Sequence, residues 1–216
     1  MELLYEDRHL WVAIKPAELL SEQTPKQDGF ADLLANENKG YVGVIHRLDR
    51  GVGGVMVYAK TPSSAAKLSA AVQKHEMQKE YLAVVCGRPT EESATLKDLL
   101  FHDRFANKTF VVDRARKGVK EAILDYQTLE TIHNEHLGDF SLLKIRLHTG
   151  RTHQIRAQFS HRGLPLLGDR KYGGLSSDSI ALFSHALTFV HPVTGKTLSF
   201  SAEPHGAAWE LFGRSE

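Results

Sequence analysis

The stretch Gly53–Leu68, GGVMVYAKTPSSAAKL, contains the sequence signals of two consecutive elements. Its uninterrupted apolar run from Gly53 to Ala59 is typical of a buried strand. Thr61-Pro62 then predicts the start of a helix, because Pro is well suited to a first helical turn. Apolar residues follow at helical spacing, at Ala65, Leu68, Ala71 and Val72. The stretch therefore predicts a buried strand that leads directly into an amphipathic helix.

Apolar runs and alternating patterns predict further strands on both sides of this stretch. They are expected at residues 10–14, 79–86, 122–129 and 140–147, with short strands around a polar loop at 96–112 and a hairpin at 182–201. Helices are expected at 151–162 and 207–212. Many strands and few helices, without βαβ alternation, predict an α+β fold with a mixed, largely antiparallel sheet and flanking helices. No linker is evident, so residues 1–216 are expected to form a single domain.

The composition is that of an ordinary globular protein, with 42% hydrophobic and 25% charged residues among 216. The single cysteine, Cys86, rules out an intramolecular disulfide. The acidic start MELLYEDRHLWVAIKP lacks the features of a signal peptide, and no apolar run is long enough for a membrane span. We therefore expect a cytoplasmic protein without membrane association, and a monomer, because no exposed apolar stripe is evident.

Charge is unevenly distributed along a chain whose net charge is only +1. Residues 1–37 hold 8 acidic and 3 basic side chains, whereas residues 144–171 hold 7 Lys and Arg against one acid. Residues 104–120 hold 6 Lys and Arg against one acid. Each basic segment alone is consistent with ordinary solvated surface, but two of them together suggest a face that binds a polyanion.

The segment before the first quoted strand, HRLDRGVGG at residues 46–54, places Asp49 between two arginines and a glycine-rich turn. Taken alone, it is consistent with a turn that carries a surface salt bridge. A nearby cation would also hold a catalytic carboxylate ionised. Tyr81, which begins an apolar strand, could likewise be a core aromatic or a residue that faces a cleft.

A third segment, LHTGRTHQIR at residues 147–156, predicts a strand end, a turn and a helix start. Free backbone N–H groups at such a start favour an anion such as phosphate. Ile155 and Phe159 form an apolar i, i+4 pair, so the adjacent Arg156 is expected to be partly buried and to need a carboxylate partner. Asp49 is the candidate partner. The twelve histidines show no convincing zinc spacing, so no metal site is expected.

These segments together resemble the RluA family of RNA pseudouridine synthases. The resemblance runs almost from end to end, through YEDRHLWVAIKPAELL, HRLDR with GVMVYAKT, KEYLAVVCG, LHTGRTHQIRAQFSHRGLPLLGDRKYGG and FSHALTFVHPVTGKTLSFSAEP. It implies the pseudouridine synthase catalytic fold and the isomerisation of particular uridines in RNA. It implies a structured RNA partner, either a ribosomal or a transfer RNA stem-loop, and no cofactor. No separate S4-type RNA-binding module is expected.

The resemblance also implies roles for individual residues. Asp49 matches the catalytic aspartate that attacks the sugar or base, Tyr81 the tyrosine that stacks on the uracil, and Arg156 the basic partner of the aspartate. Arg47 matches the arginine that enters the RNA stack where the uridine leaves. The other residues implied in RNA binding and base flipping are His46, Arg50, Arg151, His153 and Gln154, and, within the RNA-gripping loop at residues 101–120, Lys108, Arg114, Arg116 and Lys117.

The chain departs from the family pattern at two turns. Val52-Gly53-Gly54 stands where the family usually has Thr-Ser-Gly, so two hydroxyls are absent beside Asp49. A KPAG-type turn reads KPAE at residues 15–18. The first departure leaves open a non-catalytic RNA-binding or RNA-chaperone protein on the same fold. A hydrolase that uses Asp49 is a further alternative, although such enzymes usually need a second carboxylate.

Overall fold

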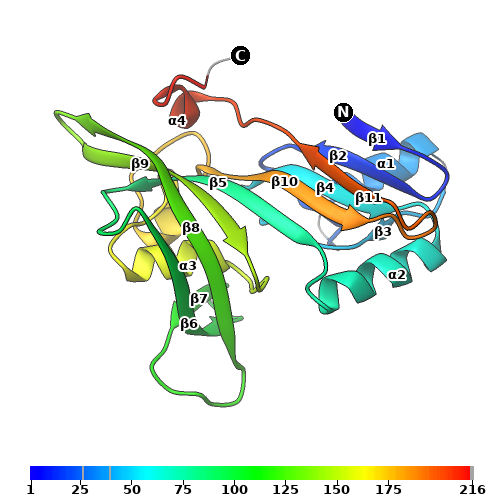
Figure 1. Ribbon diagram of the computed structural model, residues 1–216, viewed down its shortest axis with the longest axis horizontal. Coiled ribbons are helices and arrows are strands. Elements are labelled where there is room, and N and C mark those ends of the chain that lie inside the picture. The colour runs from blue at the N-terminus through cyan, green and yellow to red at the C-terminus, as the bar shows by residue number, and fades with distance from the viewer. Residues whose placement is uncertain (26, 39, 215–216) are drawn as a thin grey trace. The chain divides into compact units, whose positions relative to one another are not determined.

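The computed structural model describes residues 1–25, 27–38 and 40–214 (Figure 1). The chain forms two compact units, and each unit is built from two separate stretches of the sequence. The first contains residues 1–79 and 183–203, and the second contains residues 80–182 and 204–216. The single domain predicted for residues 1–216 stays a prediction, and each unit is described by itself.

The sheet of the first unit is built on the predicted strand β4, Gly53–Ala59, which is buried along its whole length. β2 (Leu10–Lys15) lies antiparallel to β4, and β1 (Glu2–Glu6) extends the sheet beyond β2. β10 (Leu182–Val190) joins β4 in parallel and forms the predicted hairpin with β11 (Thr197–Ser201). The short β3 (Gly43–Val44) also pairs with β4.

Both faces of β4 are apolar because a helix packs against each of them. Val55 and Val57 belong to a core cluster with Leu68 of α2 (Pro62–Gln73). Tyr58, on the opposite face, makes an edge-on ring contact with Phe30 of α1 (Phe30–Asn38). The helix start predicted for α2 is confirmed, because the Thr61 hydroxyl caps the helix by accepting a hydrogen bond from Ser64 N–H at 3.2 Å.

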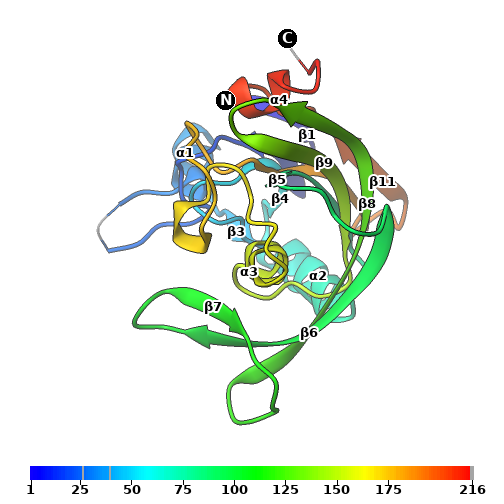
Figure 2. The same cartoon turned by 90° about the vertical axis from the view of Figure 1, so that its left-hand side faces the viewer.

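The second unit has an antiparallel sheet in the order β5-β9-β8-β6-β7. Its strands are β5 (Gln78–Cys86), β6 (Ser93–Asp103), β7 (Lys108–Val111), β8 (Val119–Asn134) and β9 (Gly138–Leu147). In Figure 2 the curved strands β8, β6 and β7 surround α3 (Gln154–His161), which is seen along its axis. A 3-10 turn, η1 (Arg170–Tyr172), and α4 (Ala207–Glu210) complete the unit.

Helix α3 packs through the two apolar residues expected from its sequence. Ile155 and Phe159 are buried, and the Phe159 ring meets Tyr126 of β8 edge-on at 5.4 Å. The expected start of the helix at Arg151 is wrong, because α3 begins at Gln154. His153 adopts a left-handed conformation with φ 52°, which ends the preceding turn and sets a new chain direction. The predicted α+β class with a mostly antiparallel sheet is confirmed.

Candidate functional site

The backbone around Asp49 is held by hydrogen bonds that do not involve its own carboxylate. Val52 N–H donates to Asp49 C=O at 3.0 Å, which closes a tight turn. The buried hydroxyl of Ser21 accepts from Leu48 N–H at 2.9 Å and donates to Leu48 C=O at 3.0 Å. The residue before Asp49 is therefore fixed on both sides, which presents the half-buried carboxylate in a defined position.

The two arginines that flank Asp49 reach the segment at residues 18–22. Arg47 donates through Nη1 to Glu22 Oε1 at 2.7 Å and keeps 68% of its side chain exposed. Arg50 donates through Nε to the Glu18 carbonyl at 3.1 Å. Both guanidinium groups are at the surface, where a phosphate could replace these weak contacts.

A buried lysine that sequence reasoning missed lies close enough to Asp49 to interact with it electrostatically. Lys15 ends β2, is inaccessible to solvent, and donates through Nζ to the carbonyls of Pro16 and Leu19 at 2.8 and 2.7 Å. Burial lowers the pKa of Lys15 to about 8, although the negative charges of Glu18 and Asp49 oppose this shift. A lysine at the end of the apolar run LWVAIK is the signal that could have identified it.

His46 is buried beneath the same segment. Its Nε2 accepts a hydrogen bond from Val57 N–H of β4 at 3.3 Å, and its buried Nδ1 has no hydrogen-bond partner among the described residues. Burial, with the positive charge of Lys79, holds the pKa of His46 well below its usual range. The imidazole is therefore neutral at pH 7 and binds β4. Its predicted role in RNA binding stays a prediction.

The Val52-Gly53-Gly54 turn is closely packed against neighbouring backbone. Gly54, where the family pattern also has glycine, has φ +125°, and a Cβ there would lie 2.4 Å from the Ser184 carbonyl oxygen. A Cβ on Gly53 would lie 3.2 Å from the Lys15 carbonyl oxygen, so a serine would need this backbone to shift by a few tenths of an ångström. Val52 is buried, and its turn is closed by a backbone hydrogen bond without any hydroxyl. Glycine thus suits the close approach of neighbouring backbone here.

Tyr81 and Arg156 belong to the second unit. Tyr81 is buried in β5, opposite Ile145 of β9. Arg156, in the first turn of α3, is only 6% exposed and forms a bidentate ion pair with Asp169. The distances are 2.6 Å from Nε to Oδ2 and 2.8 Å from Nη2 to Oδ1.

Asp169 is the carboxylate that sequence reasoning missed. It lies 13 residues after Arg156, in the segment GDRKYGG, and is 1% exposed. The guanidinium of Arg156 also lies 5.0 Å from the centre of the Tyr172 ring, which has the Lys108 ammonium at 5.1 Å. Arg156 is therefore charged, oriented and held from two directions within its own unit.

The Tyr172 hydroxyl connects the start of α3 to β7. It accepts from Thr109 N–H at 2.7 Å and lies 3.0 Å from His153 Nδ1. With one lone pair accepting from Thr109, the hydroxyl can donate its proton to Nδ1, which would put the imidazole proton of neutral His153 on Nε2. His153, one of the predicted RNA-binding residues, is thus tied to Tyr172.

Gln154, also predicted to bind RNA, makes hydrogen bonds within the protein that hold the turn before α3. Its Oε1 accepts from the Thr149 hydroxyl at 2.8 Å and from Arg151 N–H at 3.0 Å. Its Nε2 donates to the Ile123 carbonyl at 3.1 Å. Because one of the turn's N–H groups is used in this way, it is not available to the phosphate expected at this helix start.

The two basic segments differ in how many of their charges are neutralised. In residues 144–171, ion pairs join Lys144 to Glu80, Arg156 to Asp169 and Arg162 to Asp98. In residues 104–120, no carboxylate lies within ion-pair distance of a lysine or arginine in the described part of the chain. This second segment carries the predicted RNA-binding residues Lys108, Arg114, Arg116 and Lys117, all exposed except Lys108, which is half-buried. It is the better candidate for binding a polyanion.

The predicted residues thus fall into two groups. The first unit holds His46, Arg47, Asp49 and Arg50. The second unit holds Tyr81, Lys108, Arg114, Arg116, Lys117, Arg151, His153, Gln154 and Arg156. A pairing of Asp49 with Arg156 stays a prediction. Among the described residues no cluster of His, Cys, Asp and Glu could hold a metal ion, and no helix has the length and apolar character needed to cross a membrane.

Comparison with known proteins identifies the family. Residues 9–161 match the family model described as RNA pseudouridylate synthase. The chain is 33% identical to an uncharacterized RNA pseudouridine synthase of Chlorobaculum parvum, over 93% of this chain and 69% of that protein. It is 31% identical to ribosomal large subunit pseudouridine synthase D of Zymomonas mobilis, over 94% of this chain and 69% of that protein.

A solved structure shares the fold. Human RNA pseudouridylate synthase domain containing 1 superimposes with a TM-score of 0.77 at 21% identity, over 94% of this chain and 83% of that one. The matched motifs and the extent of the sequence similarity confirm the resemblance to the RluA-type enzymes. The chain therefore belongs to the RNA pseudouridylate synthase family, whose members isomerise uridine to pseudouridine in RNA.

Proposed function

We propose that this chain isomerises specific uridines in large-subunit ribosomal RNA, with Asp49 as the nucleophile. The observation that carries the proposal is the family match over residues 9–161, which includes Asp49, Tyr81 and Arg156. The substrate class comes from relatives such as the Zymomonas mobilis protein, whose name refers to the large ribosomal subunit.

The reaction exchanges one bond to the sugar for another. The N1–C1′ bond of uridine breaks, a C5–C1′ bond forms, the C5 proton leaves and N1 gains a proton. Asp49 attacks the sugar or the base, which requires an ionised carboxylate. Arg156 supplies a fixed positive charge to it, and Tyr81 stacks on the uracil and is a candidate acceptor for the C5 proton.

The target uridine must leave its stack before Asp49 can reach it, which costs roughly a few kcal/mol. Arg47 fills the space that the base leaves. Its guanidinium supports this role because it is exposed and is held only by a surface ion pair with Glu22. The unpaired cations of residues 104–120 bind phosphates of a structured RNA. A monomer is sufficient for this arrangement.

The glycine-rich turn does not require the alternative of a non-catalytic RNA-binding protein. Although Val52 and Gly53 bring no hydroxyl, their turn still keeps the backbone of Asp49 fixed. A hydrolase would release free base or sugar, which isomerisation does not.

The proposal is tested by tritium release from transcripts labelled at uridine C5. Unmodified large-subunit ribosomal RNA and a pool of unmodified transfer RNA would be incubated with the chain in parallel. Release from ribosomal RNA alone, followed by mapping to discrete uridines, is the expected result. Release only from transfer RNA would overturn the substrate class, and absence of release from both would overturn the activity.

A further inference from the structure

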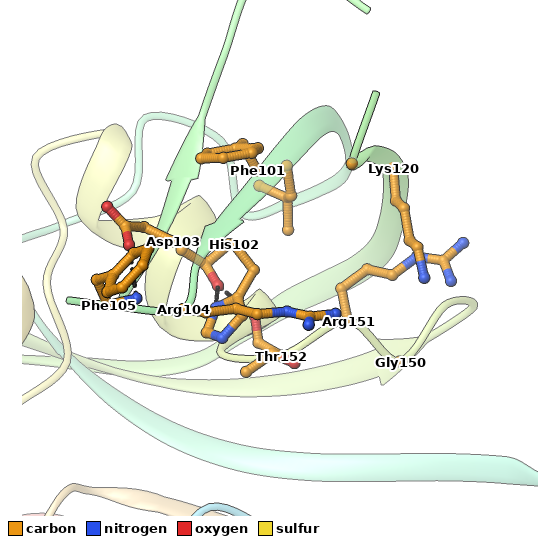
Figure 3. A pocket seen from close by; sticks show the side chains of 12 residues that line it. Phe101, His102, Asp103, Arg104, Phe105, Lys120, Gly150, Arg151 and Thr152 are labelled. Atoms are coloured by element: carbon orange, nitrogen blue, oxygen red, sulfur yellow. Dashed lines mark hydrogen bonds between the residues drawn. The ribbon is translucent and has the colours of Figure 1, made fainter. Parts of the chain in front are cut away.

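The second unit contains a pocket of about 670 Å³ between the β6–β7 hairpin and residues 150–152 (Figure 3). Aromatic and cationic side chains dominate its lining, which includes Phe101, His102, Arg104, Phe105, Lys120 and Arg151. Its volume lies in the range of pockets that hold small organic molecules. All of these residues except Arg151 lie in the segment at residues 101–120 that is proposed to bind RNA phosphates, but Phe101, His102 and Phe105 have no individual role in the site proposed above.

The hairpin turn holds an aromatic ring out into solvent. Asp103 Oδ1 accepts from Phe105 N–H at 2.8 Å and from Ala106 N–H at 3.1 Å. Lys171 Nζ donates to the Asn107 carbonyl at 3.1 Å, which ties the turn to η1. Phe105 is fully exposed on this fixed turn. An exposed ring on a constrained backbone offers a flat apolar face at little entropic cost.

A second ring, Phe101, also lines the pocket. The Arg116 guanidinium lies 4.8 Å from its centre. Gly118 lies against the ring edge, where an added Cβ would be 3.5 Å from Cε2. The ring is therefore fixed in orientation and carries a cation.

The charge of the pocket favours an anion. Arg104, Lys120 and Arg151 have no carboxylate partner within the described residues. Arg151 is held through Nε, which donates to the Glu121 carbonyl at 2.9 Å. Figure 3 shows Lys120 and Arg151 extending to the same side of the pocket. The acid in the lining, Asp103, accepts the two N–H groups of its own turn.

We propose that this pocket receives one unpaired nucleotide of the substrate RNA other than the uridine that is isomerised. The base stacks on Phe105 and Phe101, and the phosphate binds Arg104, Lys120 and Arg151. Flat rings beside cations match the two parts of a nucleotide, because every base has a π face and every phosphate is an anion. This inference rests on the proposed function and adds a means of selecting the RNA loop.

The test measures RNA binding and isomerisation separately. Wild type, Phe105→Ala and Arg104→Ala would be titrated with the ribosomal RNA fragment that carries the mapped uridine. Leu137→Ala, an exposed apolar residue on the β8–β9 turn, is the control for Phe105→Ala. Arg88→Ala, an exposed arginine paired with Asp139, is the control for Arg104→Ala.

Phe105→Ala should weaken RNA binding roughly 5- to 150-fold, the effect expected for one lost base stack. For Arg104→Ala, the plot of the logarithm of the RNA association constant against the logarithm of the salt concentration should become less steep, by about 0.7 in slope. A series of RNAs with a single abasic nucleotide near the target should contain one position that reproduces the Phe105→Ala loss. That RNA should bind Phe105→Ala no more weakly than it binds wild type.

Unchanged RNA binding by Phe105→Ala, or an equal loss of binding in Leu137→Ala, would overturn the inference. If wild type still isomerised the RNA, the proposed function would remain intact. Competition by free AMP or UMP at the concentration at which the RNA binds would also overturn it, because the pocket would then be a site for free nucleotides. Absence of isomerisation by wild type would instead overturn the proposed function and the inference with it.

Discussion

Arg156 and Asp169 form a buried bidentate ion pair that joins the first turn of α3 to the residue before η1. Both side chains are nearly inaccessible to solvent. A carboxylate that fixes the guanidinium plane determines where the positive charge of Arg156 can act. Asp169 is therefore a positioning residue for the arginine proposed to assist Asp49.

Asp169→Leu should lower the free energy of unfolding by about 3–5 kcal/mol, because it leaves the Arg156 charge buried without its partner. Arg156→Met should have a similar cost. The double variant should lose clearly less than the sum of the two, since no unpaired charge remains. Urea unfolding of the four proteins measures this coupling, and strictly additive losses would contradict it.

Tyr172→Phe should cost about 1–3 kcal/mol of folding free energy, because it leaves the N–H of buried Thr109 without an acceptor. Tyr126→Phe is a suitable control, since its hydroxyl donates to the Glu91 carbonyl at 3.1 Å at a part-buried position. Urea unfolding of both variants makes the comparison. A smaller loss for Tyr172→Phe than for Tyr126→Phe would contradict the proposed bridging role.

Glu18→Gly should stabilise the protein relative to Glu18→Ala. Glu18 has φ +68°, in the left-handed region, at the position where the family's KPAG-type turn has glycine. Both variants remove the carboxylate, but only glycine removes the steric cost of this conformation, about 1 kcal/mol. Thermal or urea unfolding compares the two variants, and equal stabilities would show that the turn carries no such strain.

Because of Lys15, the free energy of unfolding should increase as the pH rises above about 8. The folded chain releases the Lys15 proton near pH 8, whereas the unfolded chain keeps it to about pH 10.4. The unfolded state therefore binds more protons between these values, so the contribution of Lys15 to stability increases with pH. From pH 7 to 9.5, wild type should gain about 1–2 kcal/mol relative to Lys15→Met.

Unfolding of wild type and Lys15→Met at the two pH values tests this prediction. The difference between the proteins cancels the contributions of other titrating groups. A difference that stays constant, or that moves against wild type, would contradict the burial of a titrating ammonium.

Local sequence signals were sufficient for the elements that carry their own pattern. β4 was predicted with its observed bounds because it is one apolar run, and α2 because Thr61 and Pro62 mark its start. β1 was missed because it is a largely exposed strand that begins and ends with glutamate. α1 was missed because its short sequence, FADLLANEN, has no long apolar stripe.

Contacts between segments that are distant in the sequence could not be predicted from such local signals. The pairing of Arg156 with Asp169 depends on the course of the loop between α3 and η1, which no spacing rule gives. The burial of Gln154 depends on Thr149 and Ile123 converging on one amide. Motif resemblance identified the segments, but it did not predict that Gln154 makes internal hydrogen bonds in the turn before α3.

Single-turnover tritium release shows whether Asp49 is the nucleophile of an RNA pseudouridine synthase. Wild type and Asp49→Asn would be compared on the same C5-labelled ribosomal RNA, with RNA binding and unfolding measured in parallel. We expect release by wild type, no detectable release by Asp49→Asn, and similar RNA binding and stability for both. Release by Asp49→Asn at the wild-type rate would contradict this expectation.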